Sequence, residues 1–207
     1  MLVDQAVLLR EKGRWTTKEL PVVTVPPTIK ALIGARIDRL TADERAVLEL
    51  ASIEGREFAR STLAQLTPER LSSELGSLLD VLVRKELIRE ATPDGEAFDF
   101  RHGLIRDVTY ESMPKRTRAD LHERFADLAG ARRRSPESDE VIGFHLERAC
   151  RYRLELGDAD DRTRTLAAAA AKRLGAAARH AAARRDEKAA ASLRERADAL
   201  ADVAAER

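Results

Sequence analysis

Cysteine, aromatic residues and long apolar runs are scarce in this chain. Among its 207 residues Cys150 is the single cysteine, and aromatic residues make up 4%. One cysteine excludes an internal disulfide and a cysteine-based zinc site. No segment approaches the roughly 20 apolar residues that cross a bilayer, and no apolar run follows a basic start as in a signal peptide. The sequence therefore predicts a cytoplasmic protein without membrane contact, with a core built mostly from Leu, Ile, Val and Ala.

The residues that would carry catalysis are also missing. The chain has no G-x-x-x-x-G-K-[ST] loop, so we do not expect it to cradle nucleotide phosphates or to position Mg²⁺. It contains no recognisable acidic pair of a cyclase metal site and no Ser-His-Asp or Cys-His arrangement. The histidines are too scattered in sequence to predict a zinc site; they are His102, His122, His145 and His180. We expect no catalytic activity from this chain alone, and we interpret His122 and His145 as helix residues near the core boundary.

Helical periodicity is the strongest positive feature. Charged residues make up 35% and apolar residues 43%, a composition typical of soluble globular proteins. Apolar residues in 29–40 fall on one helical face. Thr41 and Glu44 have the spacing of a capping box, which predicts that the next helix begins there. Shorter helices are expected over residues 1–10 and 60–66.

A β-hairpin is predicted in the middle of the chain. A helix with a strong apolar stripe is expected over residues 69–86. The segments 87–90 and 97–101 are short strand candidates, and the second alternates apolar and polar residues. Pro93 to Gly95 lie between them, where Pro presets φ and Gly permits positive φ. Helical spacing then resumes, so His102 should stand at the first turn of a further helix.

The order of three helices and a hairpin predicts a winged-helix domain over residues 26–114. Its third helix, 69–86, has a mixed and slightly acidic polar face, and the turn at 92–96 is acidic. A DNA-reading helix and wing need exposed basic or amide side chains. The net charge of +1 adds no overall attraction to nucleic acid. Protein–protein packing is therefore the better interpretation of this domain.

The C-terminal half is predicted to be helical throughout. Residues 115–157 are expected to form linker helices, with the basic cluster 115–118 as a solvated helix start. Residues 158–207 are rich in alanine, with many charged residues between. They could form a helical hairpin that breaks near Arg184 to Asp186, with spacing like that of a tetratricopeptide repeat. One long surface helix is the alternative. The fold class is thus mainly α with one short β-hairpin.

Several ordered sequence blocks resemble the region that follows the nucleotide-binding core in STAND-class signalling ATPases. This class of ATPases includes bacterial regulators linked to adenylate/guanylate cyclase domains or to LuxR-type DNA-binding domains. The blocks are Pro26-Pro27-Thr28-Ile29, Asp38-Arg39-Leu40, Asp43-Glu44-Arg45, Ile53-Glu54-Gly55-Arg56-Glu57-Phe58, Phe100-Arg101-His102-Gly103-Leu104-Ile105-Arg106-Asp107-Val108-Thr109-Tyr110, Arg118-Ala119-Asp120-Leu121-His122-Glu123 and Ile142-Gly143-Phe144-His145-Leu146-Glu147. The resemblance covers about residues 1–157, and it extends weakly into the tail.

The resemblance implies an order of P-loop ATPase, helical lid, winged helix and helical repeats, so that residues 1–25 would belong to the lid. Phe100-Arg101-His102 resembles the Met-His-Asp motif of the related NB-ARC proteins, in which the His reaches the β-phosphate of ADP. His102 matches this latch position, and Gly103 stands in place of the motif's Asp. Arg101 and Arg106 could support the same anion. For each of the three, a structural or surface role is the alternative.

The resemblance thus implies a non-catalytic regulatory segment of an ATP-binding protein. Its partners would be a P-loop nucleotide-binding domain, in cis or in trans, and a protein effector on the helical repeats. ADP or ATP with Mg²⁺ would belong to that ATPase domain, since the chain alone has no cofactor. Two alternatives remain open from the sequence. One is a winged-helix DNA-binding transcription regulator, and the other is a stand-alone helical adaptor.

Overall fold

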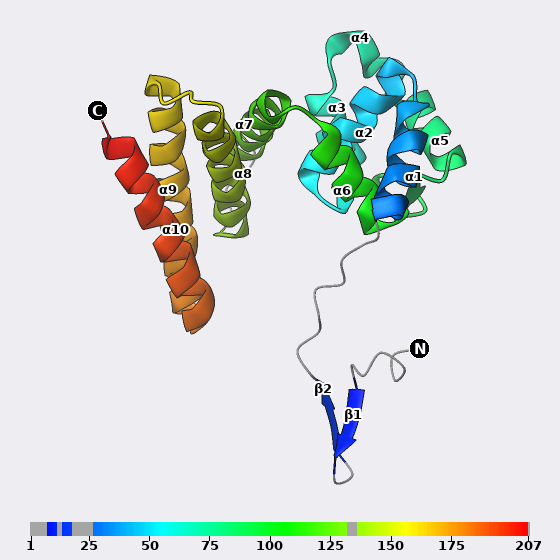
Figure 1. Ribbon diagram of the computed structural model, residues 1–207. Coiled ribbons are helices and arrows are strands. Elements are labelled where there is room, and N and C mark those ends of the chain that lie inside the picture. The colour runs from blue at the N-terminus through cyan, green and yellow to red at the C-terminus, as the bar shows by residue number, and fades with distance from the viewer. Residues whose placement is uncertain (1–7, 12–13, 18–26, 132–135, 207) are drawn as a thin grey trace.

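The computed structural model describes residues 8–11, 14–17, 27–131 and 136–206 of the chain (Figure 1). This part is mainly helical, as the sequence predicts, with a small three-stranded antiparallel sheet and a separate two-stranded hairpin. The helices are α1 Pro27–Asp38, α2 Ala42–Glu54, α3 Arg60–Leu66, α4 Glu69–Ser72, α5 Leu75–Arg84, α6 Gly103–Ser112, α7 Lys115–Ala131, α8 Pro136–Glu155, α9 Asp161–Ala183 and α10 Glu187–Ala205.

The capping box predicted at the start of α2 is confirmed. The Glu44 amide donates to Thr41 Oγ1 over 3.2 Å, and the Thr41 amide donates to Glu44 Oε2 over 2.9 Å. Two otherwise unpaired backbone donors at the helix N-terminus are thereby satisfied. Lys85 Nζ also contacts Glu44 Oε2 over 2.6 Å. The Lys85–Glu44 pair therefore fixes the start of α2 against the end of α5.

The predicted hairpin is present as β4 (Ile88–Glu90) and β5 (Ala97–Phe100). Gly95 adopts φ +67°, the positive value that its turn requires. A third strand, β3 (Glu57–Ala59), pairs with the other edge of β5, so the strand order is β3-β5-β4. This strand was not predicted because its three residues are too short for a readable alternation.

The single helix predicted over residues 69–86 is wrong, because the chain forms α4 and α5 with a break at Ser73 and Glu74. The Glu74 amide bonds the Leu71 carbonyl over 3.1 Å, the shorter i→i−3 pattern of a tightened turn. Serine side chains compete with the helix here, since Ser72 Oγ bonds the Pro68 carbonyl over 3.3 Å. The apolar stripe continues across the break, which is why periodicity alone suggests one helix.

A strand, β1 (Leu8–Glu11), stands where a helix was predicted, and it pairs with β2 (Arg14–Thr17) in antiparallel register. The helix predicted for 1–10 is therefore wrong at residues 8–10. Isolated helices of this length are marginal in water, whereas the Trp-Thr-Thr run of β2 favours strand. The rest of that prediction, residues 1–7, and most of the proposed lid segment up to residue 25 lie outside the described residues.

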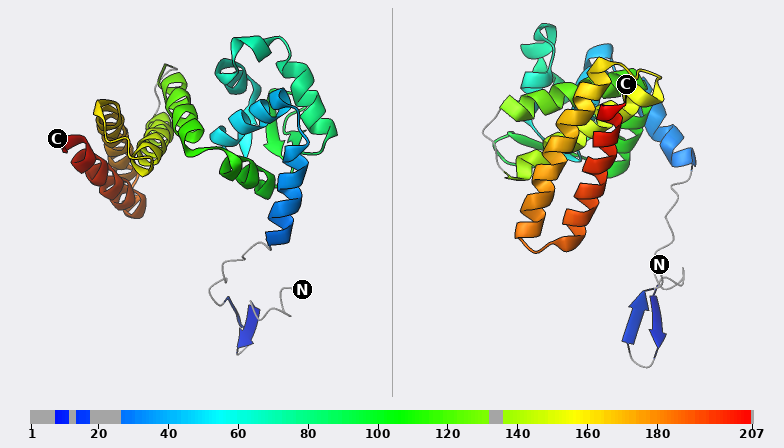
Figure 2. Two further views of the ribbon diagram at one scale, coloured as in Figure 1. Left: turned by 45° about the horizontal axis from the view of Figure 1, so that its top comes forward. Right: turned by 90° about the vertical axis from the view of Figure 1, so that its left-hand side faces the viewer.

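Helices α7 to α10 form a row in which each helix packs on the next (Figures 1 and 2). The Ala-rich tail is two helices, so the alternative of one long surface helix is wrong. The break falls at Arg184 to Asp186 as predicted, with Arg185 at φ +61°. Asp186 caps α10 by accepting from the Ala189 amide over 3.0 Å.

Two hydrophobic cores meet at α7 and α8. The first joins α1 to α6 and the sheet, and it also includes Leu121, Phe125 and Tyr152 from α7 and α8. The second fills the space among α7 to α10, and it includes Ala126 of α7 and Ile142 of α8. The boundary between the two cores thus runs along α7 and α8, so these helices do more than link two separate units.

Candidate functional site

His102 is the N-cap residue of α6 and its side chain is exposed. Its backbone is extended at φ −140° and ψ 139°, and the side chain makes no capping hydrogen bond. The His102 carbonyl accepts from the Ile105 amide over 2.9 Å, which closes the first turn. An exposed imidazole therefore stands beside the N-terminus of a ten-residue helix, where free amides and the helix dipole favour an anion.

The two neighbouring arginines have different surroundings. Arg101 is exposed, and its backbone amide bonds the Leu87 carbonyl over 3.0 Å. Arg106 lies one turn into α6 with its Nε donating to the Ser52 carbonyl over 2.9 Å. A second nitrogen of Arg106 contacts Asp107 Oδ1 over 3.1 Å. These contacts hold the Arg106 guanidinium on the C-terminal end of α2, which favours the structural interpretation of that residue.

A polar arrangement is buried between α6, α7 and α8. It joins side chains that are at most 7% exposed, namely Tyr110, His122, His145 and Tyr152. Tyr110 Oη lies 2.7 Å from His122 Nε2 and 2.9 Å from Tyr152 Oη. His122 Nδ1 lies 2.8 Å from His145 Nδ1. We call these four residues the buried network.

Arg118 gives the buried network a direction. Its guanidinium, which can only donate, bonds Tyr152 Oη over 3.1 Å. Among the possible arrangements, one leaves no hydroxyl proton of the network without an acceptor. In it Tyr152 donates to Tyr110, Tyr110 donates to His122 Nε2, and His122 Nδ1 donates to His145 Nδ1. Hydrogen-bonding capacity thus assigns the proton of His122 to Nδ1 and that of His145 to Nε2.

Burial keeps the network neutral. It lowers the pKa of His122 to about 2 and that of His145 to about 4, and nearby Arg148 and Arg106 act in the same direction. Burial and the Tyr152 hydroxyl raise the pKa of Tyr110. Guanidinium groups cover the rings: Arg118 lies 5.3 Å from the Tyr110 centroid and Arg106 lies 4.7 Å from it. Neutral imidazoles are therefore the stable form near pH 7.

The network joins α6 to α7 and α8, and this is a role that sequence reasoning missed. His122 and His145 were expected at the core boundary, but they are 1% and 2% exposed and bond each other. The available signal was their position on helices beside apolar neighbours such as Phe125, whose ring stacks on His145 at 4.1 Å. No local pattern announces that two such histidines will meet across different helices.

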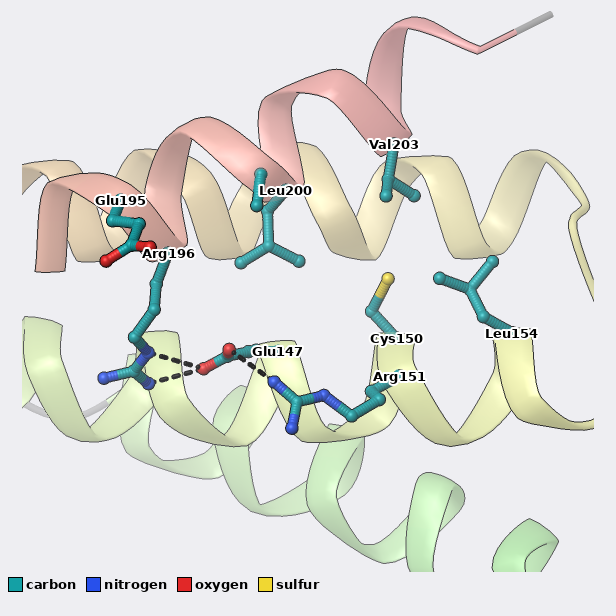
Figure 3. Close-up of a pocket in the computed structure, with 9 residues that line it drawn as sticks. Glu147, Cys150, Arg151, Leu154, Glu195, Arg196, Leu200 and Val203 are labelled. Carbon is teal, nitrogen blue, oxygen red and sulfur yellow. Dashed lines mark hydrogen bonds and ion pairs between the residues drawn. The ribbon is translucent and has the colours of Figure 1, made fainter. Parts of the chain in front are cut away.

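A second feature is the groove between α8 and α10, with α9 behind it (Figure 3). Its volume is about 450 Å³, and Leu154, Leu200 and Val203 contribute apolar surface. Glu147 stands at one end, where it accepts from Arg196 Nε over 3.0 Å and from Arg151 over 3.0 Å. The groove therefore has an apolar middle and a wall of paired charges.

Cys150 lines the same groove and is otherwise buried. Burial raises the pKa of its thiol, so the reactive thiolate is disfavoured. Cys150 therefore packs as an apolar residue of α8 and not as a reactive thiol.

Within the described ranges, no three His, Cys, Asp or Glu side chains gather closely enough to hold a metal ion. None of the helices in these ranges combines the length and the apolar character needed to cross a bilayer. Comparisons with protein-family models, with curated proteins and with solved structures each returned no match.

Proposed function

We propose that this chain is a non-catalytic regulatory segment of a STAND-type ATP-dependent signalling protein. In this proposal the unit from α1 to α6 is a winged helix that packs on a nucleotide-binding domain. The helix–strand–helix order followed by the β4–β5 hairpin supports it. The row α7 to α10 would be the start of a helical-repeat sensor, and the protein would act in the cytoplasm.

One observation carries the proposal: α6 has His102 at its start and Tyr110 of the buried network near its end. These residues are eight positions apart, or about 12 Å along a helix that rises 1.5 Å per residue. Tyr110 then contacts His122 of α7, which contacts His145 of α8. A single rigid helix thus links the nucleotide-facing residue of the proposal to the helical row.

The proposed mechanism has two states. With ADP bound to the partner domain, His102 would hold the domains closed by bonding the β-phosphate. An effector on the helical row would move α7 and α8, and the buried network would pass this displacement to α6. Such a switch requires the effector to bind one state more tightly than the other. ADP, ATP and Mg²⁺ belong to the partner domain in this scheme.

The test is His102→Ala in a protein that carries both this chain and its P-loop domain, with His180→Ala as the control. Both histidines are exposed, and His180 lies on α9 away from the winged-helix unit. We expect His102→Ala to weaken ADP binding and to raise basal signalling, whereas His180→Ala changes neither. Unchanged ADP affinity and unchanged basal signalling in His102→Ala would remove the latch and favour a helical adaptor.

Direct DNA binding gains no support from the exposed residues of the winged-helix unit. On α5 the outward positions include Ser77, Asp80 and Arg84, a neutral combination. In the hairpin, Arg89 is paired with Asp99 across the strands at 2.9 Å. A recognition helix and wing would instead present unpaired basic side chains.

A further inference from the structure

A cationic cavity lies between the C-terminal end of α1 and the segment that connects α5 to β4. Its volume is about 260 Å³, and its lining consists of Arg36, Arg39, Leu40, Lys85 and Leu87. The polar side chains of this lining are all cations that only donate hydrogen bonds, and no carboxylate is among them. We call it the basic cavity. Its chemistry selects an anion.

Two contacts of the lining residues with other parts of the protein fix the basic cavity. Arg36 donates to the Lys85 carbonyl over 2.9 Å, which ties the end of α1 to the end of α5. Lys85 Nζ contacts Glu44, whose side chain is only 9% exposed. Of the three cations, Lys85 is therefore the one that is paired with a carboxylate in the described residues. Within the described ranges the exposed Arg39 side chain makes no ion pair, so its guanidinium remains available.

The unfavourable end of the α1 dipole is covered. A helix C-terminus carries partial negative charge on its carbonyls, which would repel an anion. Arg45 donates to the Ile37 carbonyl over 3.1 Å and to Asp38 over 2.8 Å, so these groups are already neutralised. The positive side chains consequently dominate the field at the basic cavity.

Three contacts place the basic cavity at the His102 end of α6. Helices α1 and α6 pack together, and Lys30 near the start of α1 pairs with Glu111 near the end of α6 at 3.0 Å. The two helices therefore run in opposite directions, so the end of α1 lies beside the start of α6. The Arg101 amide bonds the Leu87 carbonyl over 3.0 Å, and Leu87 lines the cavity.

We propose that the basic cavity binds the phosphate groups of a nucleotide, with Arg39 as the main ligand and Arg36 and Lys85 in support. One guanidinium group can donate two parallel hydrogen bonds to two phosphate oxygens. Arg36 and Arg39, which are three positions apart, bring two such groups to the cavity. The cavity is slightly smaller than the roughly 300 Å³ at which sites for whole drug-sized ligands begin, so it fits phosphates and not the base. The geometry and charge of the cavity alone support phosphate binding. The further statement that a partner domain supplies the nucleotide rests on the proposed function.

The experiment measures binding of pyrophosphate, ADP and adenosine to the whole chain by calorimetry. We expect pyrophosphate and ADP to bind with similar affinity and adenosine not to bind. Arg39→Gln should weaken pyrophosphate binding about tenfold, the effect of losing one charge-assisted hydrogen bond. Arg39→Lys should retain part of the affinity. Arg194→Gln, which removes a charge from another exposed arginine, on α10, should leave the affinity unchanged.

Three results would overturn the basic cavity as a phosphate site. The first is no pyrophosphate binding, and the second is binding of adenosine as tight as that of ADP. The third is an equal loss of pyrophosphate affinity in Arg39→Gln and Arg194→Gln, because this would indicate unspecific charge attraction. Arg39 is the chosen position because Arg36 has a structural bond that its replacement would break. The two proposals fail separately: a silent His102→Ala variant removes the latch even if pyrophosphate still binds.

Discussion

The Nδ1 atoms of His122 and His145 lie 2.8 Å apart in the buried space between α7 and α8. A hydrogen bond at this distance holds one proton between the two nitrogens. Adding a second proton would bring two N–H groups face to face and would place a charge among guanidinium groups in a dry site. The hydrogen bond between His122 and His145, which joins α7 to α8, is therefore the contact of the network that is most sensitive to pH.

The first prediction concerns acid stability. The pKa values of His122 and His145 are lowered in the folded chain, to about 2 and about 4, against about 6.5 when unfolded. The unfolded chain therefore binds more protons below pH 6.5, so stability is full above that pH and falls as pH drops. Between pH 7.5 and 5.5 each imidazole should cost about 1 kcal/mol of unfolding free energy. Urea unfolding across this range measures the loss.

The controls for this prediction are single histidine replacements. His145→Asn should remove about half of the pH slope, whatever its effect on absolute stability. His180→Gln should retain the slope, because this exposed residue lies on α9 outside the buried network. A wild-type slope that survives in His145→Asn would show that the buried network does not set the acid response.

The second prediction separates the two tyrosines of the network. Tyr110→Phe removes the hydroxyl that bonds His122 Nε2, and it leaves this nitrogen of a 1%-exposed imidazole without a hydrogen-bond partner. The expected cost is about 1–3 kcal/mol of unfolding free energy. Tyr152→Phe should cost less, because Tyr110 can still donate to His122. Thermal and urea unfolding of the two variants give the comparison.

The double variant tests whether these residues act as one network. If they do, Tyr110→Phe combined with Tyr152→Phe should cost less than the sum of the two single changes, since their shared 2.9 Å bond is lost in either. Strict additivity would contradict this coupling, and a larger cost for Tyr152→Phe than for Tyr110→Phe would contradict the direction assigned from Arg118.

The parts of the fold that were predictable are those fixed by nearby residues. The capping-box residues Thr41 and Glu44 are three positions apart, and the turn at Gly95 depends on its own positive φ. The break at Arg184 to Asp186 is likewise local, because Asp186 caps the helix that follows. In each case the residues that form the feature are adjacent in the sequence, so their spacing is enough to predict it.

The candidate site was harder to predict because its contacts join distant segments. Tyr110 and Tyr152 are 42 positions apart and His122 and His145 are 23 apart, so the geometry depends on how three helices pack. His102 could be placed at a helix start from sequence, but the basic cavity could not. Its Arg39 and Lys85 directly follow α1 and α5, and no motif connects them.

The last prediction concerns the contact of α8 with α9. Gly143 lies within α8, and a Cβ at this position would come 2.7 Å from Leu174 Cδ2 and 3.1 Å from the Leu174 backbone nitrogen. Leu174 is fully buried, so neither its side chain nor its backbone can easily move. Gly143→Ala should therefore lower the unfolding free energy by about 1–3 kcal/mol through overpacking.

Gly34→Ala on α1 is the matched control, because a Cβ there meets no atom within 4 Å. The same substitution should then stabilise the chain by roughly 0.5–1 kcal/mol, the ordinary gain of alanine over glycine in a helix. Urea unfolding of both variants gives the two signs in one experiment. If both substitutions stabilise the chain, α8 and α9 do not pack as closely as the distances from Gly143 to Leu174 indicate. The proposed transmission of a displacement from α8 to α6 would then lack a rigidly packed α8.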